Sequence, residues 1–210
     1  MLHVPKIYPI TNAELSGLSH ADQVRTLADA GCRFVQIREK SRSSREVFDA
    51  VVESMSLANA VGMKIILNDR VDIAIATGAH GVHLGQDDLP PVEARKLLGD
   101  EAIIGYSTHS VEQAIEAASL PIDYLAFGPI FATTTKENPD PVVGLHRIKR
   151  VRDAIGDLPL VAIGGIDISN VHNVLDAGAD SAAIISDLFV AGTPLGDRFR
   201  ALEAVVNVKH

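Results

Sequence analysis

The sequence is short of the residues that disulfides, basic surfaces and membrane spans require. Cys32 is the only cysteine among 210 residues, so no internal disulfide can form, which suits a reducing compartment. The net charge is −8 and Lys and Arg form no run, which argues against a nucleic-acid-binding face. No apolar run reaches the roughly 20 residues that span a bilayer, and the first residues lack a signal-peptide pattern. We therefore expect a cytoplasmic protein that binds neither nucleic acid nor membrane.

Aromatic residues are also scarce, at 4% of the chain with no Trp, although 47% of the residues are hydrophobic. The core must therefore come mainly from Val, Ile, Leu and Ala, a composition typical of parallel strands covered by helices. A chain of 210 residues fits one domain, and no linker or change in composition marks a boundary. We expect residues 1–210 to form a single domain.

Short apolar runs of strand type alternate with helix-like segments along the whole chain. Strand starts recur every ~20–35 residues, and glycine closes several of the expected helices. The expected strands are residues 4–10, 34–37, 64–67, 82–84, 102–104, 123–127, 160–163 and 181–185. Eight such units predict an α/β fold, a (β/α)8 TIM barrel close to its minimum size. An open doubly wound sheet is the alternative, but no G-x-G-x-x-G follows the first strand.

Two expected helices begin with a capping-box signature, Ser43 with Glu46 and Ser110 with Gln113. Another helix is expected over residues 167–177. Among the histidines, we expect His83 to lie inside the barrel with a hydrogen-bond partner, and His109 to serve loop structure. The histidines expected on solvent-facing helix surfaces are His20, His146 and His172.

In such a barrel the active site lies at the C-terminal ends of the strands, so the polar residues there are the candidate site. Asp69 follows the third strand and Asp88 follows the fourth. Parallel neighbours bring the two carboxylates together, where they repel unless a cation lies between them. This predicts a Mg²⁺ site that also contacts a phosphorylated substrate. The structural alternatives are helix capping by Asp69 and a turn at Asp88.

Three further groups of residues predict phosphate binding at the same end. Gly164-Gly165 with Ile185-Ser186 match the barrel phosphate site of the seventh and eighth loops, although tight turns would need the same glycines. Arg38 and Lys40 present two cations, unless they form surface salt bridges with Glu39. A connection of about sixteen residues carries a Thr-rich run, which we interpret as a lid over an anionic substrate. That run is Thr133, Thr134, Thr135 and Lys136.

Two phosphate sites and a metal site suggest two phosphorylated substrates, one of which loses diphosphate. Such a reaction depends on charge neutralisation and a positioned nucleophile more than on acid–base groups. The sequence has no Ser-His-Asp spacing, H-E-x-x-H or Walker motif that would indicate other chemistry.

Several of these stretches resemble the thiamine-phosphate synthase family, in the same order and over nearly the whole chain. They are residues 36–40 (QIREK), 68–70 (NDR), 81–88 (GVHLGQDD), 128–136 (GPIFATTTK) and 162–166 (AIGGI). The resemblance implies a Mg²⁺-dependent, dissociative condensation of hydroxymethylpyrimidine diphosphate with the carboxylated thiazole phosphate. The products would be thiamine phosphate and pyrophosphate, formed through a pyrimidine carbocation that the thiazole nitrogen captures.

The resemblance also implies roles for individual residues. The residues that would hold the pyrimidine diphosphate are Gln36, Arg38, Lys40, Asn68, Ser107 and Lys136, and Glu39 is counted with them as substrate-binding. The thiazole phosphate would be held by Thr133, Thr135, Gly165, Ile185 and Ser186, with Thr134 in the same loop. Catalysis would depend on Arg38, Ser107 and Lys136. Asp69 and Asp88 would bind Mg²⁺, with Asp88 chosen over Asp87 from the family pattern.

Two other functions on the same barrel compete with this one. A thiazole tautomerase, which is an isomerase, typically loses part of the diphosphate set and carries a histidine where this chain has Pro129. A non-catalytic barrel that binds phosphorylated ligands would have no need of Asp69, Asp88 and Lys136 together. The synthase uses the largest number of converging groups, so it is our prediction. The sequence makes no prediction of the oligomeric state.

Overall fold

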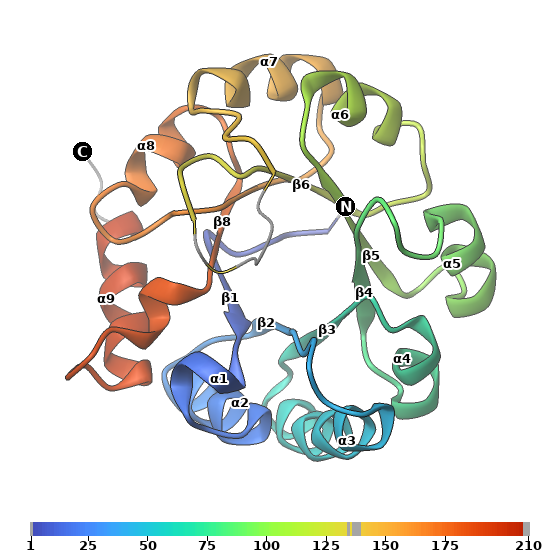
Figure 1. Ribbon diagram of the computed structural model, residues 1–210, viewed down its shortest axis with the longest axis vertical. Helices are drawn as coiled ribbons and strands as arrows, with labels where there is room; N and C mark the ends of the chain where they lie inside the picture. Colours follow the sequence, from blue (N-terminus) through green and yellow to red (C-terminus); the bar gives the residue numbers. More distant parts are fainter. Residues whose placement is uncertain (1, 134, 136–139, 208–210) are drawn as a thin grey trace.

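Eight parallel strands form a closed barrel in the computed structural model, which describes residues 2–133, 135 and 140–207 (Figure 1). Each strand pairs with the next one in the sequence, and β8 pairs with β1 to close the barrel. The strands are β1 (Ile7–Thr11), β2 (Phe34–Ile37), β3 (Lys64–Asn68), β4 (Gly81–Leu84), β5 (Ile103–Thr108), β6 (Tyr124–Phe127), β7 (Leu160–Ile163) and β8 (Ser181–Ile184). The predicted (β/α)8 barrel is confirmed.

The helices form a ring outside the strands (Figure 1). They are α1 (Ala13–Ser16), α2 (His20–Asp29), α3 (Ser44–Val61), α4 (Val71–Thr77), α5 (Pro91–Leu98), α6 (Val111–Ala117), α7 (His146–Ile155), α8 (Val171–Asp176), the 3₁₀ helix η1 (Ser186–Phe189) and α9 (Leu195–Asn207). The short α1 was not predicted. Asn12 caps it by accepting the backbone N–H of Leu15 at 2.8 Å.

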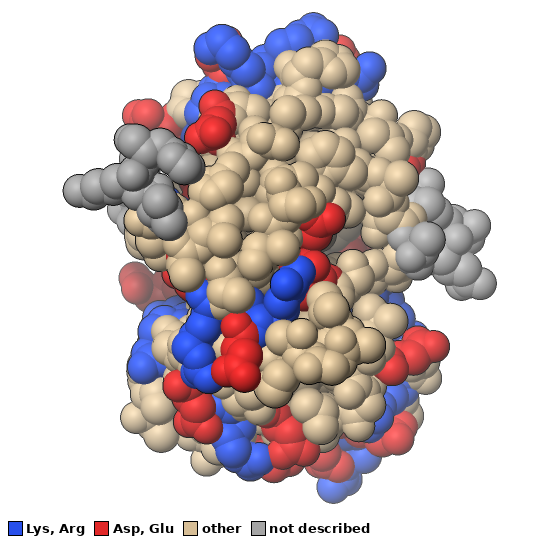
Figure 2. All heavy atoms as spheres, turned by 90° about the vertical axis from the view of Figure 1, so that its left-hand side faces the viewer, with Lys and Arg blue, Asp and Glu red and all other residues tan. Residues whose placement is uncertain are grey.

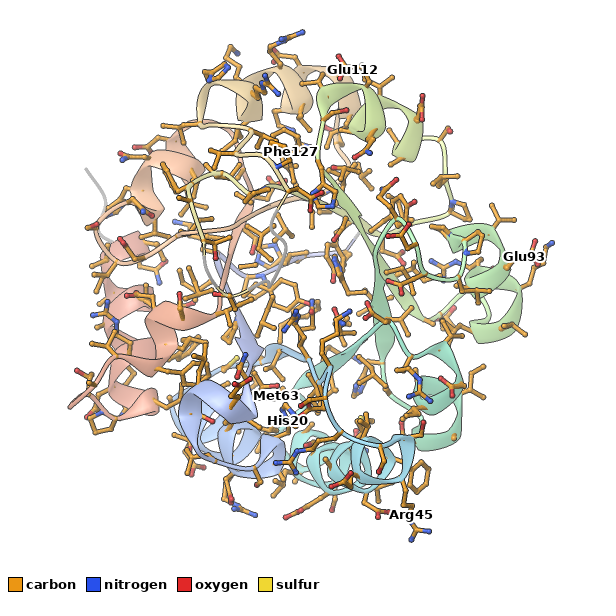
Figure 3. All side chains as sticks on the ribbon, viewed as in Figure 1. His20, Arg45, Met63, Glu93, Glu112 and Phe127 are labelled. Carbon is orange, nitrogen blue, oxygen red and sulfur yellow. The ribbon has the colours of Figure 1, made fainter. Side chains whose placement is uncertain are left out.

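Apolar side chains divide between two cores, because successive strand residues point to opposite faces. Figure 3 shows Met63 and Phe127 inside the ring of helices, whereas Arg45 and Glu93 lie at its outer rim. Both inner residues belong to the larger core, which lies between the barrel and the helices. The smaller core fills the barrel and consists of Val4, Tyr8, Ile10, Phe34, Ile66, Tyr124, Ala126, Val161 and Ala183.

Some element boundaries differ from the prediction. β1 begins at Ile7 rather than at residue 4, because its pairing with β8 begins at Ile7, which lies opposite Ala182. β5 continues to Thr108, since its polar residues still pair with β6 as they approach the barrel mouth. α8 begins at Val171 rather than at residue 167, because the Asp167 carboxylate accepts the next N–H groups and forms a turn.

The two predicted capping boxes behave differently. Ser43 and Glu46 form the full reciprocal box. Ser110 accepts the N–H of Gln113 at 3.1 Å, but the Gln113 side chain accepts from the N–H of His109 rather than from Ser110. The second box is therefore only half formed, and its glutamine stabilises the residue before the cap.

On the face shown in Figure 2, charged residues of both signs gather at the top and over the lower half, with a broad uncharged area between them. Oppositely charged residues also pair along single helices, as Arg45 does with Asp49 on α3. In the part of the chain that the structure describes, no helix combines the length and the hydropathy needed to cross a membrane.

Two ion pairs of the same design hold the N-terminal end of the barrel. Asp123, which precedes β6, accepts the N–H of Ile104 at 2.7 Å and binds Arg95 of α5 at 2.6 Å. Asp180, which precedes β8, binds Arg152 of α7 at 2.7 Å and likewise accepts a strand N–H. Each carboxylate therefore joins one outer helix to the strands and satisfies a backbone donor that would otherwise lack a partner.

Asp123→Asn should lower the free energy of unfolding by about 1–3 kcal/mol, because a charge-assisted bond to Arg95 is lost. Urea unfolding followed by circular dichroism measures this change. Asp157→Asn, at an exposed position, is the matched control and should stay within about 0.5 kcal/mol of the parent protein. Identical unfolding midpoints for Asp123→Asn and the parent protein would contradict the role of this ion pair.

Candidate active site

The strand ends bring most of the predicted site residues to one mouth of the barrel. Strand register places Gln36 beside Ile66 and Asn68 beside His83, so β2, β3 and β4 deliver polar groups at similar depth. The described candidates at this end are Gln36, Arg38, Glu39, Lys40, Asn68, Asp69, Asp88, Ser107, Thr133, Thr135, Gly165, Ile185 and Ser186. Thr134 and Lys136 lie outside the described residues, so their assignments stay predictions.

Asp69 and Asp88 lie with their carboxylates in contact. Burial, together with the neighbouring Asp69, raises the pKa of Asp88. The Lys40 ammonium binds Asp69, and Asp88 accepts the N–H of Gly85 at 2.6 Å. The mouth therefore holds two acids that are only partly neutralised by the protein itself.

This donor set fits Mg²⁺, which prefers a few carboxylate oxygens and completes its coordination with water and substrate phosphate. Within the described residues, no group of three or more His, Cys, Asp or Glu side chains is arranged to enclose a metal ion. Asp69 and Asp88 would therefore supply two ligands and leave the others to the substrate. Such an open site suits a metal that arrives with a diphosphate.

Asp69 has a left-handed backbone conformation, with φ at 61°, and is the one non-glycine residue with positive φ in the described ranges. Its N–H donates to the carbonyl of His83 at 2.8 Å, and the next N–H turns back to Asn68. Left-handed backbone at residues other than glycine costs free energy and concentrates at functional sites. The neighbouring strands hold this turn, which brings the Asp69 carboxylate against Asp88.

Asn68 supplies a donor that the protein does not use. Its side chain is 8% exposed, and its amide nitrogen has no hydrogen-bond partner among the described residues. Because buried donors in proteins are nearly always paired, this amide indicates a ligand acceptor at the mouth. Arg38 and Lys40 lie close by, along a cavity of about 220 Å³ that Arg42 also lines.

Glu39 is bound by the protein itself. Its Oε1 accepts the N–H groups of Lys40 and Ser41, each at 2.9 Å, and its Oε2 lies 3.2 Å from Nε2 of His20. Burial raises the pKa of Glu39, but the bonds from Ser41 and His20 outweigh it and bring the pKa to about 2. Its contacts hold the loop that carries Arg38 and Lys40, and the assignment of Glu39 to substrate binding stays a prediction.

The prediction that His20 faces solvent is wrong. Its side chain is 2% exposed and lies inside the ring of helices (Figure 3). Nδ1 is 2.7 Å from the Thr11 hydroxyl, and Nε2 reaches Glu39. His20 opens α2 directly beneath the β2 loop, and burial lowers its pKa. His146 is exposed, as predicted, and His172 is half-buried.

Loops after β7 and β8 form the candidate phosphate cradle. Gly165 has φ at 64°, and a Cβ there would lie 2.4 Å from the carbonyl oxygen of Ala132. The glycine therefore serves the packing of the sixth loop as well as access to the backbone. The N–H groups of Gly165 and Ser186 donate to no acceptor in the described part of the chain, which leaves them open to an anion.

Side chains that the sequence analysis did not select hold this cradle in place. Asp187 binds Arg198 of α9 and accepts the N–H of Ile168 at 3.1 Å, so it ties the β8 loop to the β7 loop. Asn170 donates its amide to the carbonyl of Gly165 at 3.0 Å. The only signal in the sequence was the position of Asp187 directly after the predicted phosphate residue Ser186.

The sixth loop is anchored at both ends. The N–H of Val143 donates to the carbonyl of Pro129 at 2.9 Å, and the N–H of Phe131 donates to the carbonyl of Gly164 at 3.0 Å. His109 adds a bond of 2.7 Å to the carbonyl of Gly128, which agrees with its predicted role in loop structure. The run predicted to act as a lid extends beyond the described residues, so the lid stays a prediction.

Anion-binding groups on opposite sides of one barrel mouth indicate an enzyme that handles phosphorylated substrates. A sequence model described as thiamine monophosphate synthase matches residues 7–188, and the chain belongs to this family. The family resemblance stated from the motifs is thus confirmed, and so is the enzyme class, a transferase.

Named relatives cover almost the whole chain. The thiamine-phosphate synthase of Koribacter versatilis (strain Ellin345) is 46% identical in an alignment of 196 residues that covers 90% of this chain and 91% of that protein. The thiamine-phosphate synthase of Chloroflexus aurantiacus is 40% identical over 204 residues, 97% of this chain and 93% of that protein. The solved thiamine phosphate pyrophosphorylase of Pyrococcus furiosus superposes with a TM-score of 0.85 at 32% identity, covering 96% and 95% of the two chains.

Glu39→Gln should destabilise the protein in a pH-dependent way. The folded pKa of about 2 lies below the ordinary value of 4.5, so the carboxylate contributes stability above pH 4.5 and loses it as pH falls through 2. We expect a loss of about 1–3 kcal/mol at pH 7 that shrinks below pH 4.5, measured by urea unfolding. Glu101→Gln, at an exposed position, is the control. A difference that stayed constant with pH would rule out this role.

Proposed function

We propose that this enzyme joins an aminopyrimidine methyl diphosphate to the carboxylated thiazole phosphate, giving thiamine phosphate, pyrophosphate and the carbon dioxide lost from the thiazole carboxyl group. Support comes from membership of the thiamine monophosphate synthase family and from the names of the relatives. The observation that carries the proposal is the contact of Asp69 and Asp88 beside Lys40, at the same mouth as the Gly165 and Ser186 cradle. The two acids with Lys40 suit a metal-bound diphosphate, and the cradle of Gly165 and Ser186 suits a monophosphate.

At the diphosphate end, Arg38 and Lys40 would neutralise phosphate oxygens, and the amide of Asn68 would donate to one of them. A Mg²⁺ ion held by Asp69 and Asp88 would stabilise the negative charge of the departing pyrophosphate. The C–O bond between the pyrimidine methylene and the diphosphate breaks with its electron pair on oxygen. Lys136 is proposed to neutralise charge on the same leaving group.

At the thiazole end, the cradle would hold the phosphate so that the ring nitrogen faces the methylene carbon. The nitrogen lone pair then forms the new C–N bond with the cation that pyrophosphate departure leaves behind. The bond to the thiazole carboxylate breaks with loss of carbon dioxide, and its electron pair stays on the ring carbon until a proton takes its place. The residues proposed to hold this substrate are Thr133, Thr134, Thr135, Gly165, Ile185 and Ser186. Positioning of this kind accelerates capture because the two partners are already aligned when the cation forms. Gln36 and Ser107 are proposed to hold the pyrimidine ring.

We also propose that the enzyme is located in the cytoplasm. Both substrates carry phosphate charges that do not cross lipid unaided, so an enzyme that uses them belongs where they are made. A cytoplasmic location agrees with a single cysteine, Cys32, which is buried and whose thiol pKa burial raises to about 12.

The direct test supplies the purified protein with both substrates, with and without Mg²⁺, and measures pyrophosphate together with thiamine phosphate. Product that requires both substrates and the metal supports the synthase. Aromatisation of the carboxylated thiazole precursor without condensation would instead identify a tautomerase. If the protein is folded but shows neither activity, the result would favour a barrel that binds phosphorylated ligands without catalysis.

Asp69→Asn and Asp88→Asn should each lower Mg²⁺-dependent turnover by more than about 100-fold, since each removes a proposed metal ligand. Asp87→Asn is the matched control, because Asp87 is exposed and adjacent but is not assigned to the metal. Turnover is measured across a Mg²⁺ titration, and circular dichroism checks the fold. If Asp87→Asn lost turnover while Asp88→Asn kept it, the metal ligand would have to be reassigned.

A further inference from the structure

A chain of hydrogen bonds crosses the barrel interior just below the mouth. The amide nitrogen of Gln36 is 3.1 Å from the Tyr8 hydroxyl, which is 3.0 Å from the Tyr124 hydroxyl. Tyr124 is 2.9 Å from Nδ1 of His83, and Nε2 of His83 is 2.8 Å from the Ser107 hydroxyl. Each residue comes from a different strand. Gln36 and Ser107, at the two ends of this row of hydrogen bonds, are the residues that the proposed function assigns to the pyrimidine ring.

The three middle residues are tightly built into the barrel. The Tyr124 ring stacks on His83 with centroids 5.5 Å apart and meets Tyr8 edge-on at 5.9 Å. A Cβ on Gly105 would lie 2.0 Å from the Tyr124 ring, so β5 needs glycine there to make room for it. A buried hydroxyl or imidazole without a hydrogen-bond partner costs free energy, so the fold is more stable when Tyr8, Tyr124 and His83 all keep their partners.

The available protons fix the direction of donation along this row of hydrogen bonds. The Gln36 amide nitrogen can only donate to Tyr8, so the Tyr8 proton must go to Tyr124; in the reverse order it would have no acceptor among the described residues. Tyr124 then donates to Nδ1 of His83. A neutral imidazole has one donor and one acceptor, so the His83 proton lies on Nε2 and is donated to Ser107.

Charge states agree with this direction. Because Tyr124 donates to Nδ1 of His83, that nitrogen carries no proton, so the ring is neutral. Burial raises the pKa of both tyrosines, so both hydroxyls keep their protons. Since Ser107 accepts from His83, its own proton is free to point into the mouth. Gln36 donates its amide nitrogen to Tyr8, which leaves its carbonyl oxygen available to accept from a ligand.

We propose that His83, fixed by Tyr124, is a positioning residue that makes Ser107 a hydrogen-bond donor and so selects an aminopyrimidine. This inference rests on the proposed function. The mouth then presents one donor, Ser107, and one acceptor, Gln36. An aminopyrimidine matches both, because its ring nitrogens accept and its amino group donates. His83 itself touches no substrate in this arrangement and acts through Ser107.

Two amide variants at position 83 separate this role from packing. His83→Gln extends a donor toward Ser107, whereas His83→Asn is one methylene shorter and reaches only the Tyr124 side. We expect His83→Asn to lower kcat/KM for the pyrimidine diphosphate by about 10–100-fold and His83→Gln to stay within about 3-fold. The KM for the thiazole phosphate should stay unchanged in both. Equal losses in the two variants, or a rise in the KM for the thiazole phosphate, would overturn the proposal.

A second measurement does not depend on activity. Nitrogen-15 NMR of the ring nitrogens, assigned by comparison with His83→Gln, should show a neutral His83 with its proton on Nε2. A proton on Nδ1, or a charged ring at pH 7, would overturn the inference. Parent protein that made no thiamine phosphate but showed the Nε2 proton would count against the proposed function alone. If the parent protein were active and His83→Asn kept the same kcat/KM, only the positioning role of His83 would be contradicted.

Discussion

The repulsion between Asp69 and Asp88 is the constraint around which the mouth of this barrel is arranged. Two carboxylates in contact in a partly buried setting are unfavourable unless positive charge lies beside them. Lys40 supplies part of that charge, and a left-handed turn at Asp69 keeps the acid in place despite its backbone cost. A folded barrel that maintains such a pair favours ligands that bring cations with them, as a metal-bound diphosphate does.

The surroundings of this pair are fixed by groups that never reach the substrate. His20 and Glu39 hold the loop with Arg38 and Lys40 from below, and Asp187 with Arg198 does the same for the cradle on the other side. Both supports are largely buried, so solvent does not compete for their hydrogen bonds. Each half of the mouth therefore has its own buried support, and the sixth loop is anchored to one of them through Gly164.

Sequence reasoning located the fold and most of the mouth because both follow from short-range patterns. Strand runs, helix-ending glycines and polar residues at strand ends can be read without knowing any partner, and they placed Asn68, Asp69 and Asp88 correctly at one end of the barrel. The features of the site that could not be predicted depend on contacts between segments far apart in the sequence. A helix pattern could not tell that the first residue of α2 lies beneath the β2 loop, so His20 was expected in solvent.

Other contacts were hidden for the same reason. The sequence analysis did not single out Tyr8 or Tyr124, because nothing in a strand sequence shows that two hydroxyls 116 residues apart meet inside the barrel. Glu39 was read with its cationic neighbours, although its backbone partners at Ser41 determine where its carboxylate lies. A tyrosine within an expected strand was the available signal, since a buried phenol needs a partner.

Closure of the barrel by β1 and β8 has a consequence for how the chain is synthesised. Lys6 reaches from beside β1 to the carbonyl of Val206 in α9, so the first and last elements meet at one seam. During translation β1 has one unpaired edge until β8, at the far end of the sequence, has left the ribosome. An exposed strand edge is a template for pairing with another chain. The nascent protein therefore passes through a long interval in which a half-built sheet must be shielded, and only the last seventh of the chain, which begins with β8, ends that exposure.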